Sequence, residues 1–76
     1  MNLPSGKQIR AARNLLNLSA TDLANRVGAN AHQVYRVERK RAPALAVRLC
    51  AELESLGARF VGGGVVIQVA DNDRRP

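Results

Sequence analysis

The chain has 76 residues, which is enough for one small domain with one hydrophobic core. Its single cysteine excludes an internal disulfide or a cluster of metal-binding thiolates. One histidine, no paired acids in a plausible cleft and no cofactor motif argue against an enzyme, and we expect no cofactor and no metal. No apolar run approaches the roughly 20 residues that span a bilayer, and no signal-peptide pattern is present. We therefore expect a cytoplasmic protein.

Positive charge is concentrated in the first two-thirds of the chain. Residues 1–48 contain nine basic and two acidic side chains, a net charge of +7. Residues 49–76 contain three basic and four acidic side chains, a net charge of −1. A generally solvated surface would not require this segregation, whereas a polyanion partner would favour it.

Two helices are predicted first. Ser5 and Gln8 form a capping-box pattern, and apolar residues then follow at helical spacing over about residues 6–16. Ser19 and Asp22 repeat the capping pattern at the start of the second helix. A glycine ends that helix, since glycine takes the left-handed conformation without steric cost.

The third predicted helix is short and strongly basic. Asn30 caps it, and it extends to about Arg39. Val34 and Val37, three residues apart, are its aliphatic contacts with the rest of the protein, so most of the helix faces outward. Such a helix keeps little of its surface for the core.

The rest of the chain predicts a fourth helix and a hairpin. The helix follows Pro43, carries leucines at spacings of three and four, and ends before Gly57. Cys50 lies between these leucines and is expected to be a buried small hydrophobic residue. Two β-branched runs around a glycine turn then predict a hairpin over residues 58–70. Residues 71–76 are charged and predict a disordered tail.

The second and third helices match the helix-turn-helix pattern, which needs a small residue where the helices cross, a glycine at the turn and aliphatic residues inside. The six positions that match are Leu23, Ala24, Val27, Gly28, Val34 and Val37. The stretch QIRAARNLLNLSATDLANRVGANAHQVYRVERKRAPAL, within residues 8–56, resembles the DNA-binding domain of the Cro and lambda-repressor-type (XRE) helix-turn-helix family.

The resemblance implies a mostly α fold with a four-helix lambda-repressor-like domain over residues 1–57, and the residue pattern adds a C-terminal β-hairpin over residues 58–70, in the place of the fifth helix often seen in the family. It implies a sequence-specific, double-stranded-DNA-binding transcriptional regulator of phage or mobile-element type in a bacterial cell, associated with the nucleoid. We expect a repressor that binds an inverted-repeat operator as a homodimer, with no small-molecule ligand. The alternative is a protein-interaction module, an anti-activator or antitoxin, in which DNA binding is secondary.

The resemblance also assigns roles to individual residues. It places contacts with DNA bases at Ala31, His32 and Arg36. Gln33 and Tyr35 flank these positions and belong to the same base-reading face. The resemblance places contacts with the DNA backbone at Arg13, Ser19, Ala20, Asn30, Arg39, Lys40 and Arg41. Ala20 can offer only its backbone N–H there. Arg13 and Glu38 match a structural pair that ties the first helix to the end of the third.

The predicted hairpin is expected to join two subunits. Its second strand is apolar on both faces, and a lone hairpin leaves unpaired edge groups that invite another strand. The dimerisation residues expected from this argument are Phe60, Val65, Val66, Ile67 and Val69. The alternative is that the hairpin covers only its own core and that dimers form on DNA.

Overall fold

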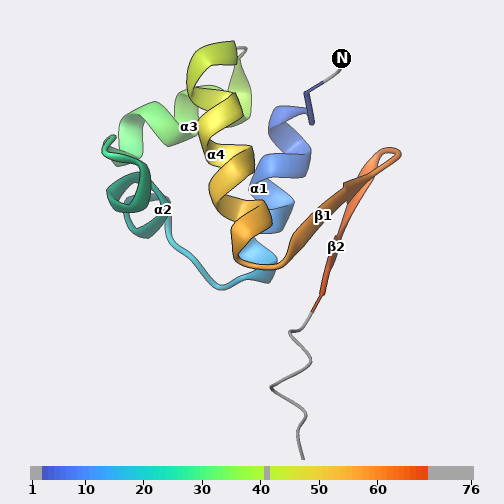
Figure 1. Cartoon of the computed structure of the whole chain (residues 1–76). Helices are drawn as coiled ribbons and strands as arrows, with labels where there is room; N and C mark the ends of the chain where they lie inside the picture. The colour runs from blue at the N-terminus through green and yellow to red at the C-terminus, as the bar shows by residue number, and fades with distance from the viewer. Residues whose placement is uncertain (1–2, 41, 69–76) are drawn as a thin grey trace, which may run out of the picture.

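The computed structural model describes residues 3–40 and 42–68 of the chain. Its elements in chain order are α1 (Gly6–Leu15), α2 (Ala20–Val27), α3 (Ala31–Arg39), α4 (Pro43–Ser55), β1 (Ala58–Val61) and β2 (Gly64–Ile67). This mostly helical architecture with a two-stranded antiparallel hairpin agrees with the prediction (Figure 1). Predictions for Arg41, Val69 and the tail 71–76 lie outside the described residues.

The first three helices begin with the same polar arrangement, a reciprocal capping box. In each box, the first side chain accepts a hydrogen bond from the backbone N–H three residues later, and the later side chain accepts one from the first residue's N–H. The three pairs are Ser5 with Gln8, Ser19 with Asp22, and Asn30 with Gln33. The first two boxes and the Asn30 cap are confirmed predictions.

Two residues with left-handed backbone separate the first helices. Gly28 ends α2, as predicted, with a φ of 73°. Asn17 has a φ of 59°, so the chain turns tightly after α1. Arg48 of α4 donates a hydrogen bond to the carbonyl of Val27 and satisfies one of the acceptors at the end of α2.

The hydrophobic core is built from residues of all four helices and Ala58 of the hairpin. Helix α4 contacts each of the other three helices (Figure 1). The largest fully buried side chains are Ile9, Leu23, Val34, Leu49 and Leu53. Complete burial of each such side chain contributes about 1.5–3 kcal/mol to stability. The leucine spacing that predicted the inner side of the fourth helix therefore identified its core residues.

The hairpin belongs to the same core. Ala58 pairs with Ile67 and Phe60 pairs with Val65, so these four side chains share one face of the sheet. Ala58 is buried, and Phe60, Val65 and Ile67 pack against the helical core. β1 contacts α4, while β2 contacts α1. Three of the five residues expected at a dimer interface, Phe60, Val65 and Ile67, thus face their own domain, because the inner face of the hairpin packs against the helical core.

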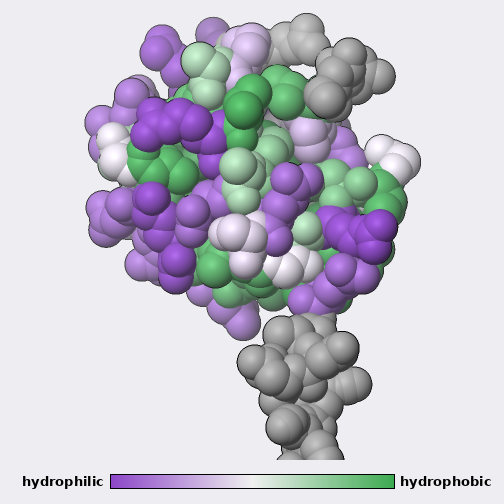
Figure 2. Space-filling view, in the orientation of Figure 1, coloured by the Kyte–Doolittle hydropathy of each residue, from purple (hydrophilic) through white to green (hydrophobic). Residues whose placement is uncertain are grey.

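The opposite face of the hairpin is exposed. Val61 and Val66 lie on it with exposed fractions of 45% and 47%. On the side of the molecule seen in Figure 2, hydrophobic areas are small and separated by hydrophilic side chains. Within the described part of the chain, no helix is long and apolar enough to cross a membrane.

Candidate nucleic-acid interface

Helix α3 buries one narrow side and exposes the rest. Val34 and Val37 are 0% and 3% exposed, because they enter the core between α1, α2 and α4. The other described side chains of the helix, apart from Ala31 and Glu38, are exposed: His32, Gln33, Tyr35, Arg36 and Arg39. The outward face of α3 therefore carries two arginines, a histidine, an amide and a phenol.

A buried ion pair fixes the C-terminal half of α3 to α1. Nε of Arg13 lies 2.7 Å from Oε2 of Glu38, and Nη2 of Arg13 lies 3.2 Å from Oε1 of Glu38. The two side chains are 9% and 4% exposed. Nη1 of Arg13 also donates to the carbonyl of Leu18 at 3.1 Å. The hydrogen bond with Glu38 raises the pKa of Arg13, so the arginine stays charged.

Arg13 is engaged within the protein. All three of its guanidinium nitrogens donate to protein acceptors, and its charge is balanced by Glu38. The side chain thus connects α1 to α3 through three of its five N–H groups, and its contact with the DNA backbone stays a prediction. The guanidinium carbon of Arg13 also lies 5.9 Å from the centroid of the Tyr35 ring, a distance that permits a cation–π contact.

The helix caps account for several other residues assigned to DNA contact. Ser19 Oγ accepts from the Asp22 N–H, and Asn30 Oδ1 accepts from the Gln33 N–H. Gln33 Oε1 accepts from the Asn30 N–H at 3.0 Å, which leaves the Nε2 donors of Gln33 for an external acceptor. Ala20 is 2% exposed, so its methyl group belongs to the core. A contact by Ala20 is limited to its backbone N–H, in the first turn of α2.

An open groove of about 620 Å³ runs between α1 and α3. Lys7 and Arg10 line it from α1, and His32, Tyr35 and Arg39 line it from α3. The spacings of three and four residues place each set on one side of its helix. The resemblance assigns no role to Lys7 or Arg10. Their spacing of three on an amphipathic helix is the signal that could have identified them.

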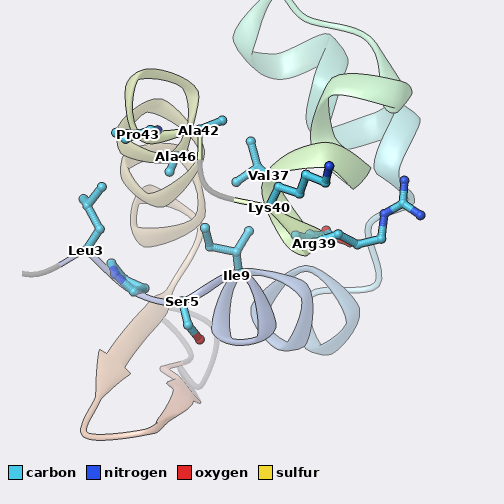
Figure 3. A pocket seen from close by; sticks show the side chains of 12 residues that line it. Leu3, Ser5, Ile9, Val37, Arg39, Lys40, Ala42, Pro43 and Ala46 are labelled. Carbon is cyan, nitrogen blue, oxygen red and sulfur yellow. The ribbon is translucent and has the colours of Figure 1, made fainter.

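A smaller pocket of about 290 Å³ lies where the start of α1, the end of α3 and the start of α4 meet. Ile9, Val37 and Ala46 come from these three helices and line it together (Figure 3). Gly6 lies against the last turn of α3, where an added Cβ would be 2.3 Å from the Glu38 carbonyl oxygen. Glycine is required there because any side chain would collide with backbone atoms.

The start of α4 differs from the other helix starts. Ala42, at its N-cap, makes no side-chain hydrogen bond, and Pro43 follows. Its first-turn N–H groups therefore have no side-chain cap and point outward from the helix end. Lys40 precedes this end of the helix and is exposed. The partial positive charge of the helix start and the lysine favour an anion at this place.

Two other arginines are engaged in packing between α2 and α4. Nη1 of Arg26 lies 3.2 Å from Oε2 of Glu52, and Arg48 bonds the end of α2. Both side chains thus connect α2 to α4, and neither lines the α1–α3 groove. The described residues contain no cluster of three or more His, Cys, Asp or Glu side chains that could hold a metal ion.

Cys50 is buried, as expected, and lies in α4. Burial, with a smaller contribution from the charge of Glu54, raises its pKa to about 11. The thiol is therefore protonated at neutral pH and is a poor nucleophile.

Comparisons of the chain with models of protein families, with curated proteins and with solved structures found no match. The resemblance to the XRE family stays a prediction from the sequence pattern within residues 8–56. The arrangement of α1, α2 and α3 is the structural basis for inferring a function.

Proposed function

We propose that this protein is a sequence-specific, double-stranded-DNA-binding transcriptional regulator of the XRE helix-turn-helix type. The observation that carries the proposal is the outward face of α3, which exposes His32, Gln33, Arg36 and Arg39 while the helix is fixed from behind by a buried ion pair. The B-DNA major groove admits one α-helix, and these side-chain types are the donors that recognise base edges there.

The orientation of α3 supports recognition of bases by a rigid element. Gly28 gives the tight turn between α2 and α3, and the Asn30–Gln33 box fixes the first turn of α3. Arg13 and Glu38 hold the other end of the helix. A binding site whose supporting contacts are already made loses less freedom when its ligand binds.

Within this face, Arg36 is the principal candidate for base contact. Its guanidinium can donate two parallel hydrogen bonds to guanine, while His32 can donate one to a purine acceptor. Ala31 is half-buried and can contact a thymine methyl group at the edge of the interface. Tyr35 lies toward α1, beside Arg13, and is better placed for the DNA backbone than for bases.

Backbone phosphates are the proposed partners of Arg39, Lys40 and the uncapped start of α4. The first two are exposed cations at the end of α3. Asn30 and Ser19 lie at the starts of α3 and α2, where first-turn N–H groups and the macrodipole favour phosphate. These contacts position a protein on DNA without reading its sequence.

Homodimerisation through the hairpin is part of the proposal. The exposed side chains on its outer face are Val61, Val66 and Arg59, which pairs across the strands with Val66, and each strand has one unpaired edge in the two-stranded sheet. A two-fold pair of hairpins would place two α3 helices about 34 Å apart, one turn of DNA.

Val66→Lys should then give a monomer in sedimentation at high micromolar concentration, whereas Leu15→Lys, at an exposed position of α1, should not. A wild-type protein that sediments only as a monomer would remove the hairpin dimer.

The base-recognition role is tested on DNA selected by the protein from a random pool. Arg36→Ala should lower the affinity for the selected site by about 1–3 kcal/mol at one or two positions and leave random DNA almost unaffected. Lys40→Ala, the control at a phosphate position, should weaken both kinds of DNA similarly. An equal loss on both DNAs with Arg36→Ala would contradict its contact with bases.

Salt dependence separates this proposal from a protein-interaction module. A regulator that neutralises several phosphates loses affinity steeply as salt rises, because bound counterions are released. Binding of duplex DNA measured between 50 and 200 mM salt should therefore fall by roughly three orders of magnitude or more. A protein that showed no such binding would be better explained as an anti-activator or antitoxin.

A further inference from the structure

The groove between α1 and α3 contains more positive charge than the residues assigned to DNA contact explain. Lys7 and Arg10 on α1 face it, and Arg39 faces it from α3. The charges of Arg13 and Glu38, at the side of the groove, cancel each other. Within the described residues, three cations without an ion-pair partner therefore line one open groove.

We propose that this groove binds the sugar-phosphate backbone of one DNA strand, with Lys7 and Arg10 as phosphate ligands. The inference rests on the proposed function and adds a second binding surface to it. Three like charges on facing helices repel one another in the free protein. A phosphate chain between them removes this repulsion and accepts hydrogen bonds from both helices.

The position of the groove beside α3 favours a DNA strand over a free anion. Packed helices have axes roughly 8–10 Å apart, and the major groove of B-DNA is about 12 Å wide. When α3 occupies that groove, a helix packed beside it lies over the groove edge, where the phosphates are aligned. Lys7 and Arg10 are exposed on the side of α1 that faces α3, so their side chains can reach this edge.

Tyr35 and Arg13 explain how the groove keeps its shape. The Tyr35 ring lies beside the guanidinium of Arg13, which is held by Glu38 and by the carbonyl of Leu18. The wall between the two helices is thus built from side chains that already have partners. Lys7 and Arg10, which form no ion pair among the described residues, remain available to a ligand.

The test compares Arg10→Gln and Lys7→Gln with Arg26→Gln in the full-length protein. Each variant loses one positive charge from an exposed helical position, but Arg26 lies on α2 and pairs with Glu52. Binding of the selected duplex and of a random duplex of equal length is measured by fluorescence anisotropy at several salt concentrations. Thermal melts of the three variants check that each remains folded.

The expected result is a sequence-independent loss. Arg10→Gln and Lys7→Gln should each weaken binding of both duplexes by about three- to tenfold and lower the salt slope by about 0.9 for each lost contact. Arg26→Gln should leave the slope almost unchanged. In a scan of single neutral methylphosphonate linkages along the selected site, one linkage should weaken the wild type but not Arg10→Gln.

Several outcomes would contradict DNA binding in the groove and leave the proposed function intact. The wild type is expected to bind the duplex with a steep salt dependence. If Arg10→Gln and Lys7→Gln then show the same affinity and salt slope as Arg26→Gln, the groove does not bind DNA. A loss confined to the selected duplex would make Arg10 a base contact. Displacement of the duplex by millimolar inorganic phosphate at matched ionic strength would indicate a free-anion site. A wild type that binds no duplex would overturn the proposed function as well.

Discussion

Helix α1 is held on two sides by polar contacts of opposite character. On the α3 side, the contact is a buried ion pair between Arg13 and Glu38. On the hairpin side, the exposed amide of Gln8 donates hydrogen bonds from Nε2 to the carbonyls of Gly62, at 3.2 Å, and Gly64, at 2.8 Å. Both contacts join segments that are far apart in the sequence.

The two contacts differ in the free energy that is lost when each one breaks, because water can replace the partners of only one of them. If the Gln8 bonds break, water replaces the lost partners, so the contact contributes little net free energy. If the Arg13–Glu38 pair loses one member, the other charge stays buried without its partner, at a cost of several kcal/mol. The helix that faces DNA in the proposed function is therefore fixed by the contact that is harder to break.

The largest effect is expected from Glu38→Ala, which should lower the free energy of unfolding by about 3 kcal/mol. Arg13 would keep its buried charge with the Leu18 carbonyl as its remaining protein acceptor. The double variant Arg13→Met with Glu38→Leu should recover most of the loss, because it removes both charges and fills similar volume. Denaturant melts measure both variants. Single and double variants that melt like the wild type would show that the pair does not fix α3.

Gly6→Ala tests the same junction without changing a charge. In an open helix position, alanine stabilises relative to glycine by about 0.8–1 kcal/mol. Here the added Cβ would lie 2.3 Å from the Glu38 carbonyl oxygen, so we expect a net destabilisation of about 1–3 kcal/mol. A denaturant melt therefore tests the contact by whether Gly6→Ala raises or lowers the free energy of unfolding.

Gly63→Ala is the matched control for that substitution. A Cβ at Gly63 meets no atom within 4 Å, and its φ is not in the left-handed range. The control should change stability by only a few tenths of a kcal/mol. A stabilising Gly6→Ala would mean that α1 and α3 are not in close contact at this point.

A smaller effect, about 1 kcal/mol, is expected from Gln8→Ala on the hairpin side. This variant loses the acceptor for the Ser5 N–H and both donors to the hairpin turn. Gln8→Glu separates the two functions, since its carboxylate can still accept from Ser5 but cannot donate to carbonyl groups. Amide hydrogen exchange should therefore quicken in α1 and the hairpin for Gln8→Ala, and mainly in the hairpin for Gln8→Glu. Equal exchange in both variants would contradict a role of Gln8 in holding the turn.

The parts of this fold that could be predicted from sequence depend on local patterns. Capping pairs, the glycine after α2 and the leucine spacing of α4 act over a few residues, so the sequence identifies them directly. The Gly6 contact and the Gln8 bonds to Gly62 and Gly64 join segments separated by 32 to 56 positions, and no local pattern encodes them. They follow only from how the helices pack.

The candidate site divides in the same way. The exposed face of α3 follows from the spacing of Val34 and Val37, which the sequence contains. Whether an arginine faces solvent or its own protein depends on the neighbouring helix. Arg10 and Arg13 are three residues apart on α1, yet Arg10 is exposed and Arg13 is 8% exposed. The difference follows from the pairing of Arg13 with Glu38, which the resemblance implied and no local pattern on α1 encodes.

The smallest effect on stability is expected from the Ser19–Asp22 capping box, because both residues lie at the start of one helix, α2. Asp22 Oδ2 accepts from the Ser19 N–H at 3.0 Å at the exposed start of α2. The hydrogen bonds with the Ser19 backbone, and then with its side chain, lower the pKa of Asp22 below its ordinary value of 3.8. A lowered folded-state pKa means that the charged form favours the folded state. The stabilisation is therefore present above pH 3.8 and is lost as the pH falls through the folded-state pKa.

Asp22→Asn keeps the acceptor oxygen but has no charge to titrate. The melting temperatures of the two proteins should differ slightly at neutral pH and converge below pH 3.8, and a constant difference down to pH 2 would contradict this origin.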